Sequence, residues 1–349
     1  MASIRPIIAE LPPHVVIFGC SEGMRQVQLK MDSIADAAVP VLIRGESGTG
    51  KEIIAKMLHQ RSSRKSGPFV KINCPAIPAA LVESELFGYE KGAFTGADGR
   101  KVGLVELAHG GTLFLDEIAE LDFGLQSKLL QLLQDGQFYP VGGKKEKQVE
   151  VRFICATNRN LEREIQAGTF RQDLFYRIKV VSLTLPALRD RQCDISMLID
   201  FFLRTFTQQF GRNLRPLSAK TKAALQQYSW PGNIRELENM IKSYVILGSE
   251  DAIRLDLLQA ENGNNVHGIN GKNGNGNGNG SKDDPTSLKA AVRALENRLI
   301  LRTLEENQWN RRRAARALKI SYRALLYRLK QSDGVLSERL HARPQAGND

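Results

Sequence analysis

A glycine-rich turn between an apolar run and a helical pattern narrows the possible folds of this chain more than any other feature. Residues 39–43 are typical of a buried strand, and residues 52–60 have helical periodicity. The turn between them contains Gly45, Glu46, Ser47, Gly48, Thr49, Gly50 and Lys51. Glycines let successive backbone N–H groups converge on phosphate oxygens, the helix N-terminus adds partial positive charge, and the lysine neutralises the outer phosphates. The pattern predicts a phosphate-binding loop; a tight turn without a ligand is the alternative.

The next residue departs from the general phosphate-loop pattern. Glu52 stands where serine or threonine usually supplies a hydroxyl to Mg²⁺. A carboxylate cannot supply that ligand in the same way, so we expect Thr49 or a water molecule to do so.

A second strand-like run, residues 112–115, ends in two carboxylates, Asp116 and Glu117. A strand ending beside the phosphate loop places Asp116 near Mg²⁺ and leaves Glu117 to polarise a water for attack on a γ-phosphate. Asp116 alone would be interpreted as a helix N-cap. Together with the phosphate loop, the pair favours nucleotide hydrolysis.

Short apolar runs alternate with helical patterns over the first half of the chain. The expected strands are 39–43, 69–72, 112–115, 151–155 and 180–185, and helices such as 52–60 and 125–133 fall between them. This alternation predicts a parallel sheet covered by helices on both faces. Three helical patterns without strands then predict a small helical subdomain: 195–210, 218–228 and 233–247.

Residues 261–281 contain 7 Gly and 8 Asn in 21 positions. Such a segment cannot bury enough surface to offset its chain entropy, so we expect a flexible linker with a reach of about 25 Å. The net charge of the chain is +11, and the last 64 residues hold 14 Lys and Arg against 6 Asp and Glu. This concentration of positive charge indicates contact with nucleic acid.

Cysteine usage and hydropathy exclude several classes of protein. The four cysteines, Cys20, Cys74, Cys155 and Cys193, are widely separated without paired spacing, which argues against a disulfide scaffold or a zinc site and favours a reduced, cytoplasmic setting. No apolar run approaches the roughly 18 residues of a membrane span. The N-terminal residues lack the apolar region of an export signal.

Between the two nucleotide motifs lies a small-residue loop with an aromatic and a hydroxyl: Gly92, Ala93, Phe94, Thr95, Gly96 and Ala97. An exposed aromatic on a mobile tip indicates a partner contact. Phe94 packed into the protein's own core is the alternative.

Six segments follow one another in the chain in this order: GESGTGKE, ELFGYEKGAFTGA, GGTLFLDEI, ATN, FRQDLFYR and WPGNIREL. Together they resemble the central domain of the sigma-54-dependent bacterial transcription activators, also called bacterial enhancer-binding proteins. The resemblance implies an α/β fold, an AAA+ P-loop NTPase with a parallel sheet sandwiched by helices, an α-helical lid subdomain and a C-terminal all-α helix-turn-helix domain. It implies these boundaries: tail 1–17, ATPase subdomain 18–189, lid 190–258, linker 259–285, DNA-binding domain 286–332 and tail 333–349.

Carried over position by position, the resemblance implies roles for individual residues. Gly45 to Glu52 would hold ATP, Asp116 would bind Mg²⁺, and Glu117 would position the hydrolytic water. Asn73 matches the residue that restrains this glutamate, and Thr157 and Asn158 match the γ-phosphate sensor. Arg171 and Arg177 match arginine fingers that reach a neighbouring subunit's ATP; without the resemblance, a solvated face would be preferred. Arg235 matches the lid arginine that senses nucleotide.

The C-terminal segment is similar to the Fis-type helix-turn-helix of this family. It departs at Lys319, where glycine is usual in the turn, and at Ala324, often threonine. The expected DNA contacts are Arg311, Arg312, Arg313, Ser321, Tyr322, Arg323, Tyr327 and Arg328. A protein-docking or RNA-binding face is the alternative for the arginine cluster.

The resulting hypothesis is an ATP-driven activator that binds double-stranded upstream DNA, assembles into a homo-oligomer, expected to be a hexamer, and moves the 92–97 loop against sigma-54 RNA polymerase. No receiver domain fits before Gly45, so control by a separate regulatory protein, by expression level or by an N-terminal part outside this sequence is expected. The alternatives are a DNA-binding regulator that acts by occupancy without sigma-54, and an AAA+ chaperone.

Overall fold

The structure is a computed structural model of the chain and describes residues 11–212, 216–251, 253, 254, 257, 303 and 313. The chain divides into two units, Met1–Ile269 and Asn270–Asp349, and nearly all of the described residues belong to the first. The predicted linker and almost all of the predicted helix-turn-helix lie outside the described residues. Of the expected DNA contacts, only Arg313 is described; it is helical and exposed.

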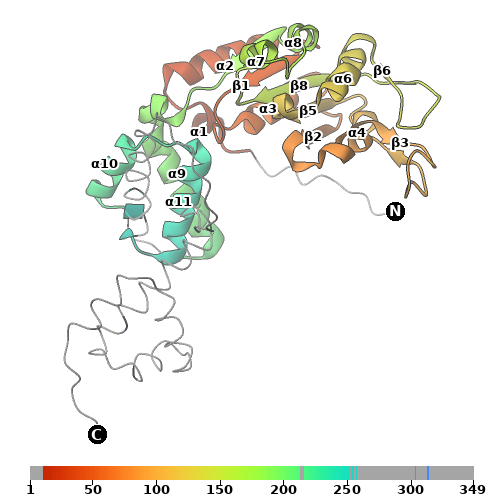
Figure 1. Ribbon diagram of the computed structural model, residues 1–349. Coiled ribbons are helices and arrows are strands. Elements are labelled where there is room, and N and C mark those ends of the chain that lie inside the picture. Colours follow the sequence, from red (N-terminus) through yellow and green to blue (C-terminus); the bar gives the residue numbers. More distant parts are fainter. Residues whose placement is uncertain are drawn as a thin grey trace, which may run out of the picture. The chain divides into compact units, whose positions relative to one another are not determined.

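A five-stranded parallel sheet forms the framework of the first unit (Figure 1). The strands follow the spatial order β2, β5, β8, β1, β9. Their bounds are β1 (Val41–Arg44), β2 (Phe69–Asn73), β5 (Thr112–Asp116), β8 (Arg152–Thr157) and β9 (Val181–Thr184). Because all strands point the same way, the residues that follow β1, β5 and β8 meet at one edge, the usual place for a ligand in an open α/β sheet.

Helices cover the sheet on both sides and form separate cores. The helices of this part are α1 (His14–Phe18), α2 (Glu22–Ile34), α3 (Lys51–Gln60), α4 (Ala79–Phe87), α5 (Leu104–Leu107), α6 (Phe123–Asp135), α7 (Leu161–Gln166) and α8 (Gln172–Ile178), with 3₁₀ turns η1 (Cys74–Ala76), η2 (Ile118–Glu120) and η3 (Leu188–Arg191). Leu42 and Leu113 of the sheet pack with residues of α4, α6 and α8. Ile43 and Phe114 point to the other face and pack with α1, α2 and α3. Alternation along the strands therefore fills two cores.

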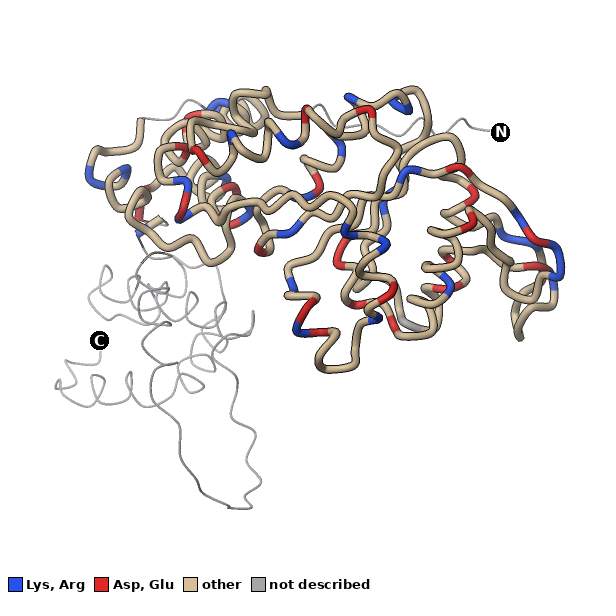
Figure 2. Tube along the Cα trace, turned by 90° about the horizontal axis from the view of Figure 1, so that it is seen from above, with Lys and Arg blue, Asp and Glu red and all other residues tan. Residues whose placement is uncertain are grey.

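Two short hairpins extend from this framework. One pairs β3 (Gly88–Tyr89) with β4 (Lys101–Val102), and the other pairs β6 (Gln137–Phe138) with β7 (Lys147–Gln148), both antiparallel. A bridge between Tyr89 and Val141 connects the two hairpins. Lysines and arginines are interspersed with acidic residues along the described chain (Figure 2).

The lid subdomain consists of α9 (Gln192–Phe210), α10 (Ala219–Gln227) and α11 (Asn233–Leu247). Its core is separate from the two cores of the sheet and includes the fully buried Leu225, Trp230 and Ile241. The turn before α11 is conformationally demanding, because Trp230 and Asn233 have φ values of +50° and +54° without being glycine. The Trp230 ring is fixed by a 3.0 Å hydrogen bond from its Nε1 to the carbonyl of Leu225.

The predicted fold class is confirmed, and the element bounds differ only at the ends. The strand expected at 39–43 begins at Val41, because Pro40 has no N–H to donate to the ladder. The helix expected at 218–228 begins at Ala219, because Ser218 is its N-cap and accepts a 3.3 Å hydrogen bond from the backbone N–H of Thr221. Among the described residues, none of the helices is long and apolar enough to cross a bilayer.

We expect the stability of this unit to fall as the pH drops below about 6.5. His59 of α3 is buried against Thr112, with 3.0 Å between Nδ1 and Oγ1. Burial and then the charge of Arg152 lower the pKa of His59 from its usual 6.5. Below pH 6.5 the imidazole of His59 binds a proton in the unfolded chain but stays neutral in the native state. The free energy of unfolding is therefore fully present above pH 6.5 and decreases as the pH falls towards the folded-state pKa.

Thermal melts from pH 7.5 to pH 5 measure this effect. The His59→Gln variant should show a weaker loss of Tm over this range than the wild type, whereas His109→Gln, which changes an exposed histidine, should keep the wild-type slope. Equal slopes for all three proteins would contradict the assignment.

Candidate functional site

The glycine-rich loop joins β1 to α3 at the carboxyl edge of the sheet. Lys51 is the first residue of α3, and its side chain is buried. Its Nζ donates to the carbonyls of Gly45 and Glu46 at 3.0 and 3.3 Å. Gly48 has a φ of +80°, and a Cβ there would meet the carbonyl oxygen of Gly232 at 2.3 Å. Glycine is therefore required at this position both by the backbone conformation and by the close approach of the lid turn.

Glu52 is engaged by two lysines that lie outside the loop. Its carboxylate pairs with Lys56 at 2.9 Å and with Lys71 of β2 at 2.6 Å. Burial raises the pKa of Glu52, but the hydrogen bonds from the two lysines outweigh this and lower it below the usual value. Thr49 is a buried residue of the loop itself, and its hydroxyl donates to the carbonyl of Glu46 at 2.8 Å.

The two acidic residues at the end of β5, Asp116 and Glu117, lie beside the loop and have different partners. Asp116 is the last residue of β5 and pairs in register with Asn73 of β2. Burial, followed by the negative charge of Glu117, raises the pKa of Asp116. A carboxylate in such a position is stabilised as the anion by a bound cation. Glu117 instead forms a 3.1 Å ion pair with Lys51.

The Glu117 carboxylate also connects the loop to the end of β8. Its Oε2 accepts a 2.9 Å hydrogen bond from the backbone N–H of Asn158, and Glu117 itself adopts a φ of +55°. Thr157 is buried, and its carbonyl accepts from the N–H of Gly45 at 3.3 Å. The structure therefore brings Lys51, Asp116, Glu117, Thr157 and Asn158 to one place. Asn73, which the family resemblance pairs with Glu117, lies beside Asp116 in the sheet. The Glu117 carboxylate is in contact with Lys51 and with the backbone of Asn158.

The turn before α11 rests directly on the loop. Arg235 donates from NH1 to the hydroxyl of Ser47 at 3.1 Å, and the N–H of Ile234 donates to the carbonyl of Gly48 at 3.0 Å. The buried Asn233 donates to the carbonyl of Ser47 at 3.0 Å and to the Glu46 carboxylate at 3.2 Å. The loop and the start of α11 are therefore joined directly by hydrogen bonds.

Glu46 is held by Arg189 of η3 and by Asn233 of the lid. Arg189 binds both of its carboxylate oxygens, with NH1 to Oε2 at 2.9 Å and NH2 to Oε1 at 2.5 Å. Hydrogen bonds from Arg189 and then from Asn233 lower the pKa of Glu46. Sequence reasoning missed Arg189 and Asn233, because a contact across 143 or more positions leaves no local pattern; the only signal was the unusual Trp-Pro-Gly turn.

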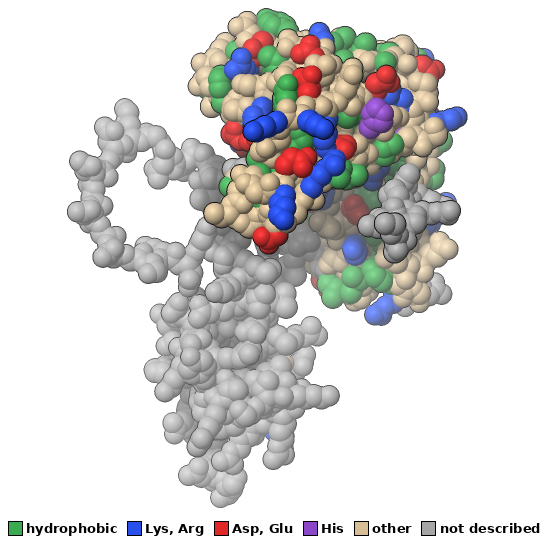
Figure 3. All heavy atoms as spheres, turned by 90° about the vertical axis from the view of Figure 1, so that its right-hand side faces the viewer, with side chains coloured by type: hydrophobic (Ala, Val, Ile, Leu, Met, Phe, Trp, Pro, Cys, Tyr) green, Lys and Arg blue, Asp and Glu red, His purple; other side chains and the backbone are tan. Residues whose placement is uncertain are grey.

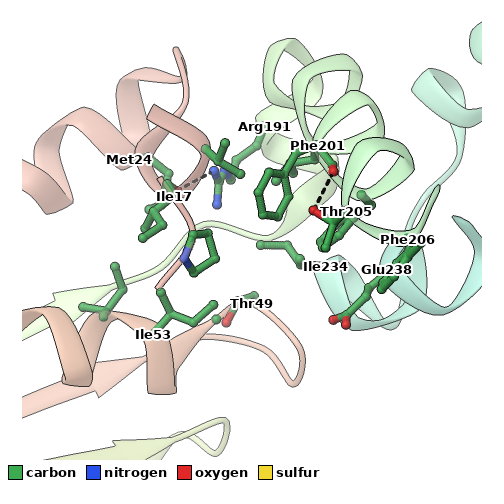
Figure 4. A pocket seen from close by; sticks show the side chains of 16 residues that line it. Ile17, Met24, Thr49, Ile53, Arg191, Phe201, Thr205, Phe206, Ile234 and Glu238 are labelled. Carbon is green, nitrogen blue, oxygen red and sulfur yellow. Dashed lines mark hydrogen bonds between the residues drawn. The ribbon is translucent and has the colours of Figure 1, made fainter. Parts of the chain in front are cut away.

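A largely apolar cavity of about 290 Å³ lies beside the loop (Figure 4). The N-terminal segment contributes Ile17, α3 contributes Ile53, and the lid contributes Phe201 and Ile234, while Thr49 and Gly50 form its border with the loop. In Figure 4 these side chains surround one space from opposite sides. The cavity was also missed from the sequence, since its walls come from four separate segments. Its size and polarity suit a flat heteroaromatic ring.

Arg171 and Arg177 lie away from the loop of their own chain. Arg171 precedes α8 and binds Asp173 at 2.7 Å and the hydroxyl of Ser127 at 3.0 Å. Arg177 donates to the carbonyl of Leu133 at 3.2 Å. These partners belong to α6 and α8, so the structure does not bring the two arginines to the site formed by Lys51 and Glu117.

The loop that contains residues 92–97 projects from β3. Gly92 and Gly96 have positive φ values, and the N–H of Gly92 donates to the carbonyl of Ala97 at 2.9 Å. The Phe94 side chain is 43% exposed, with its ring edge-on to Tyr89 at 4.9 Å. Phe94 is therefore not packed into the core, the alternative considered from the sequence.

The surface around this loop is charged. Figure 3 views the end of the molecule that carries β3 and β6, where lysine and arginine side chains gather around acidic ones. Lys101 pairs with Glu85 at 2.5 Å, and Arg100 pairs with Glu106 at 3.4 Å. These pairs hold the base of the loop, since they link β4 and the residue before it to α4 and α5.

Comparison with known families gives three consecutive matches. Residues 17–184 match the sigma-54 interaction domain, residues 189–272 match the AAA+ ATPase lid domain, and residues 291–331 match the Fis family of bacterial regulatory proteins.

Curated relatives cover most of the chain. The chain is 44% identical over 314 residues to the regulatory protein AtoC of Escherichia coli and 39% identical over 327 residues to the response regulator protein PilR of Pseudomonas aeruginosa, covering 89% and 93% of this chain. A Nif-specific regulatory protein of Enterobacter agglomerans is 43% identical over 315 residues, or 90% of this chain. The chain spans 66%, 72% and 59% of the lengths of these relatives.

Solved structures of NtrX from Brucella abortus are also similar. One is 36% identical with a TM-score of 0.65 over 90% of this chain and 69% of that one. Another, in complex with ATP, is 34% identical with a TM-score of 0.64 over the same shares of the two chains.

Proposed function

The chain belongs to the sigma-54 interaction domain family of AAA+ ATPases, and from this membership we propose that it is a transcription activator that uses ATP hydrolysis to open promoters bound by sigma-54 RNA polymerase. The observation that carries the proposal is the combination, in one unit, of the loop lysine Lys51 paired with Glu117 and the exposed Phe94 on a separate loop. The proposed domain boundaries are those expected from the sequence.

ATP would bind with its phosphates on the loop and its base in the apolar cavity. Lys51 now donates to carbonyls of its own loop, and an arriving γ-phosphate offers it a stronger, charge-assisted partner. The cavity borders the loop at Thr49 and Gly50, so phosphates and base have adjacent places. A solved structure of the similar NtrX is a complex with ATP, which supports ATP as the nucleotide.

Mg²⁺ fits the polar residues at this edge. Asp116 is half-buried with a raised pKa, and a divalent cation would remove the cost of keeping that carboxylate charged. The hydroxyl of Thr49 is the proposed second protein oxygen, since Glu52 is engaged with two lysines. The ion would neutralise charge on the β- and γ-phosphates.

Glu117 is the proposed group that orients the attacking water. In the present structure its carboxylate is held by Lys51 and by the N–H of Asn158. When Lys51 turns to a phosphate, Glu117 loses its cation and its carboxylate becomes available to accept a proton from water. Asn158 with Thr157 would sense the γ-phosphate, and Asn73 would restrain Glu117, as the family resemblance implies.

Hydrolysis requires a further cation besides Lys51 and Mg²⁺, because negative charge develops on the transferred phosphoryl group. Arg171 and Arg177 are directed elsewhere in their own chain. We assign these two arginines to the ATP of the neighbouring subunit. The proposed active species is therefore a homo-oligomer in the form of a hexameric ring. Arg235, in contact with Ser47, would report nucleotide occupancy to the lid.

The 92–97 loop is the proposed contact with sigma-54. Its glycines allow movement, its aromatic side chain is exposed, and its base is anchored to the hairpin of β6 and β7 through the hydrogen bond from the N–H of Glu90 to the carbonyl of Val141 at 3.0 Å. The Fis-type segment, which includes Arg311 to Arg313, would bind double-stranded upstream DNA.

Replacing Thr95 with alanine tests the proposal. We expect ATP turnover to stay at the wild-type rate, because Thr95 is outside the nucleotide site, while promoter opening by sigma-54 RNA polymerase is lost with the hydroxyl. The measurement is permanganate footprinting of the melted start site, run beside phosphate release. Lys91→Ala, just before the loop, should retain both activities.

The alternative, a regulator that acts by occupancy, gives a different result. Such a protein would bind DNA and change transcription equally well with threonine or alanine at position 95. Turnover without any melting by the wild-type protein would reject the proposed function.

A further inference from the structure

Cys20 and Cys193 lie next to each other although the sequence separates them. Cys20 is in the turn before α2, and Cys193 is in the first turn of α9. Their Sγ atoms and a carboxylate oxygen of Asp194 are all within 4.8 Å of one another, and both cysteines are exposed. The sequence interpretation found no paired cysteines; the fold creates this pair by placing the start of the lid against the N-terminal segment.

Asp194 organises the cluster. It is completely buried and accepts hydrogen bonds from the N–H of Cys20 at 2.6 Å, from the hydroxyl of Ser21 at 2.8 Å and from Nε of Arg191 at 2.8 Å. The Cys20 thiol donates to Oδ1 at 3.2 Å, and the Cys193 thiol is at 3.5 Å from the same atom. Burial raises the pKa of Asp194, but these donors outweigh it and hold the pKa at about 2.

This arrangement is a poor metal site. Both oxygens of Asp194 are occupied by backbone, hydroxyl and guanidinium donors. Only two thiols remain, fewer than the four ligands typical of zinc. Cys74 and Cys155 belong to a buried core on one face of the sheet and are not part of the cluster.

We propose that Cys20 and Cys193 form a reversible disulfide that links the N-terminal segment to the lid. The two sulfurs are at most 4.8 Å apart, and they must approach to about 2.05 Å to form the bond. Exposed, closely placed thiols in a reduced compartment are typical of transient, redox-sensing disulfides.

The reaction requires an oxidant, for which we name a low-molecular-weight disulfide such as glutathione disulfide. The Cys193 thiolate attacks one glutathione sulfur, forming a mixed disulfide and releasing one glutathione thiolate. The Cys20 thiolate then attacks the sulfur of Cys193, forming the internal bond and releasing the second glutathione. The two protein thiols lose two protons and two electrons, which end in two glutathione thiols. The hydrogen bonds that Cys20 makes with Cys193 and donates to the Asp194 carboxylate raise the pKa of the Cys20 thiol to about 12. We therefore do not assign the first attack to Cys20; it reacts once the mixed disulfide on Cys193 holds a sulfur next to it.

The bond would lie at the wall of the apolar cavity. Arg191, next to the cluster, donates to the carbonyl of Ile17 at 3.1 Å, and both residues line the cavity (Figure 4). A covalent link from Cys20 to Cys193 would hold this wall and the start of α9 at a fixed separation. This consequence rests on the proposed ATPase function: we expect oxidation to slow nucleotide turnover, because the lid can no longer move relative to the N-terminal segment.

Peptide mapping of the full chain after incubation with glutathione disulfide tests the bond itself. We expect one linked peptide pair containing Cys20 and Cys193, with Cys74 and Cys155 remaining as thiols. Cys20→Ser should stop at a mixed disulfide on Cys193, and Cys193→Ser should leave Cys20 as a thiol. Stable glutathione adducts on both cysteines of the wild type, without the linked pair, would overturn the proposal.

Phosphate release by the same samples tests the consequence. Oxidised wild type should lose at least half of its turnover and regain it with dithiothreitol, while Cys193→Ser, which cannot form the linked pair, should keep its turnover in glutathione disulfide. A linked peptide with unchanged turnover would overturn the regulatory role. Absence of turnover in the fully reduced wild type would instead count against the proposed function, since the linked peptide does not depend on ATP.

Discussion

The Glu117→Gln variant should bind ATP and fail to hydrolyse it. Glutamine keeps the length of the side chain and can still accept the hydrogen bond that Glu117 now accepts from the N–H of Asn158. It cannot take a proton from water, and loss of a positioned general base costs roughly 10²–10⁴ in rate. ATP affinity should not decrease, because Lys51 no longer has to leave its 3.1 Å ion pair with Glu117 when a phosphate arrives.

Phosphate release and calorimetric titration with ATP measure the two halves of this expectation. Glu120→Gln is the matched control, because it makes the same chemical change three positions later. Glu120 pairs with Arg159 at 2.5 Å on the surface, and such exposed pairs contribute little. The control should therefore keep both turnover and affinity. Wild-type hydrolysis by Glu117→Gln would remove the residue from its proposed role.

The layers of the fold could be predicted from the sequence because their signals are local. Runs of strand-forming residues and helical periodicity depend on near neighbours, so the five parallel strands and the helices α3, α6 and α11 were found with small errors at the ends. The phosphate loop and the acidic pair were also visible, since each occupies one continuous segment. The fold then places them together because parallel strands end at one edge.

Contacts made by folding across long distances could not be predicted in this way. Asn233 looks like an ordinary residue at a helix start, yet it adopts a φ of +54° and is buried against Glu46 and Ser47. The apolar cavity takes its walls from segments that are far apart in the sequence, such as Ile17, Ile53 and Phe201. Cys20 and Cys193 have no spacing pattern, and only the packing of α9 against the N-terminal segment brings them together.

Alanine at Arg171 should reduce ATP turnover at least as strongly as Glu117→Gln. An arginine supplied to a neighbouring phosphoryl group contributes about 10³–10⁵ in rate. The cost to stability should be small, because the pair of Arg171 with Asp173 is partly exposed at 29% and 46%. Arg163→Ala removes an exposed arginine of α7 and is the control. Thermal melts should be similar for all three proteins, so that the lost turnover is assigned to chemistry.

Mixing two inactive variants decides whether the arginine acts on its own subunit or on the next. In a head-to-tail ring, each site combines the Glu117 of one chain with the arginine of its neighbour. An Arg171→Ala chain has an intact Glu117, and a Glu117→Gln chain has an intact Arg171. In a ring assembled at random from equal amounts, roughly a quarter of the boundaries join these two intact residues. Turnover should therefore reappear on mixing, whereas an arginine acting within its own chain would leave every site in the mixture broken.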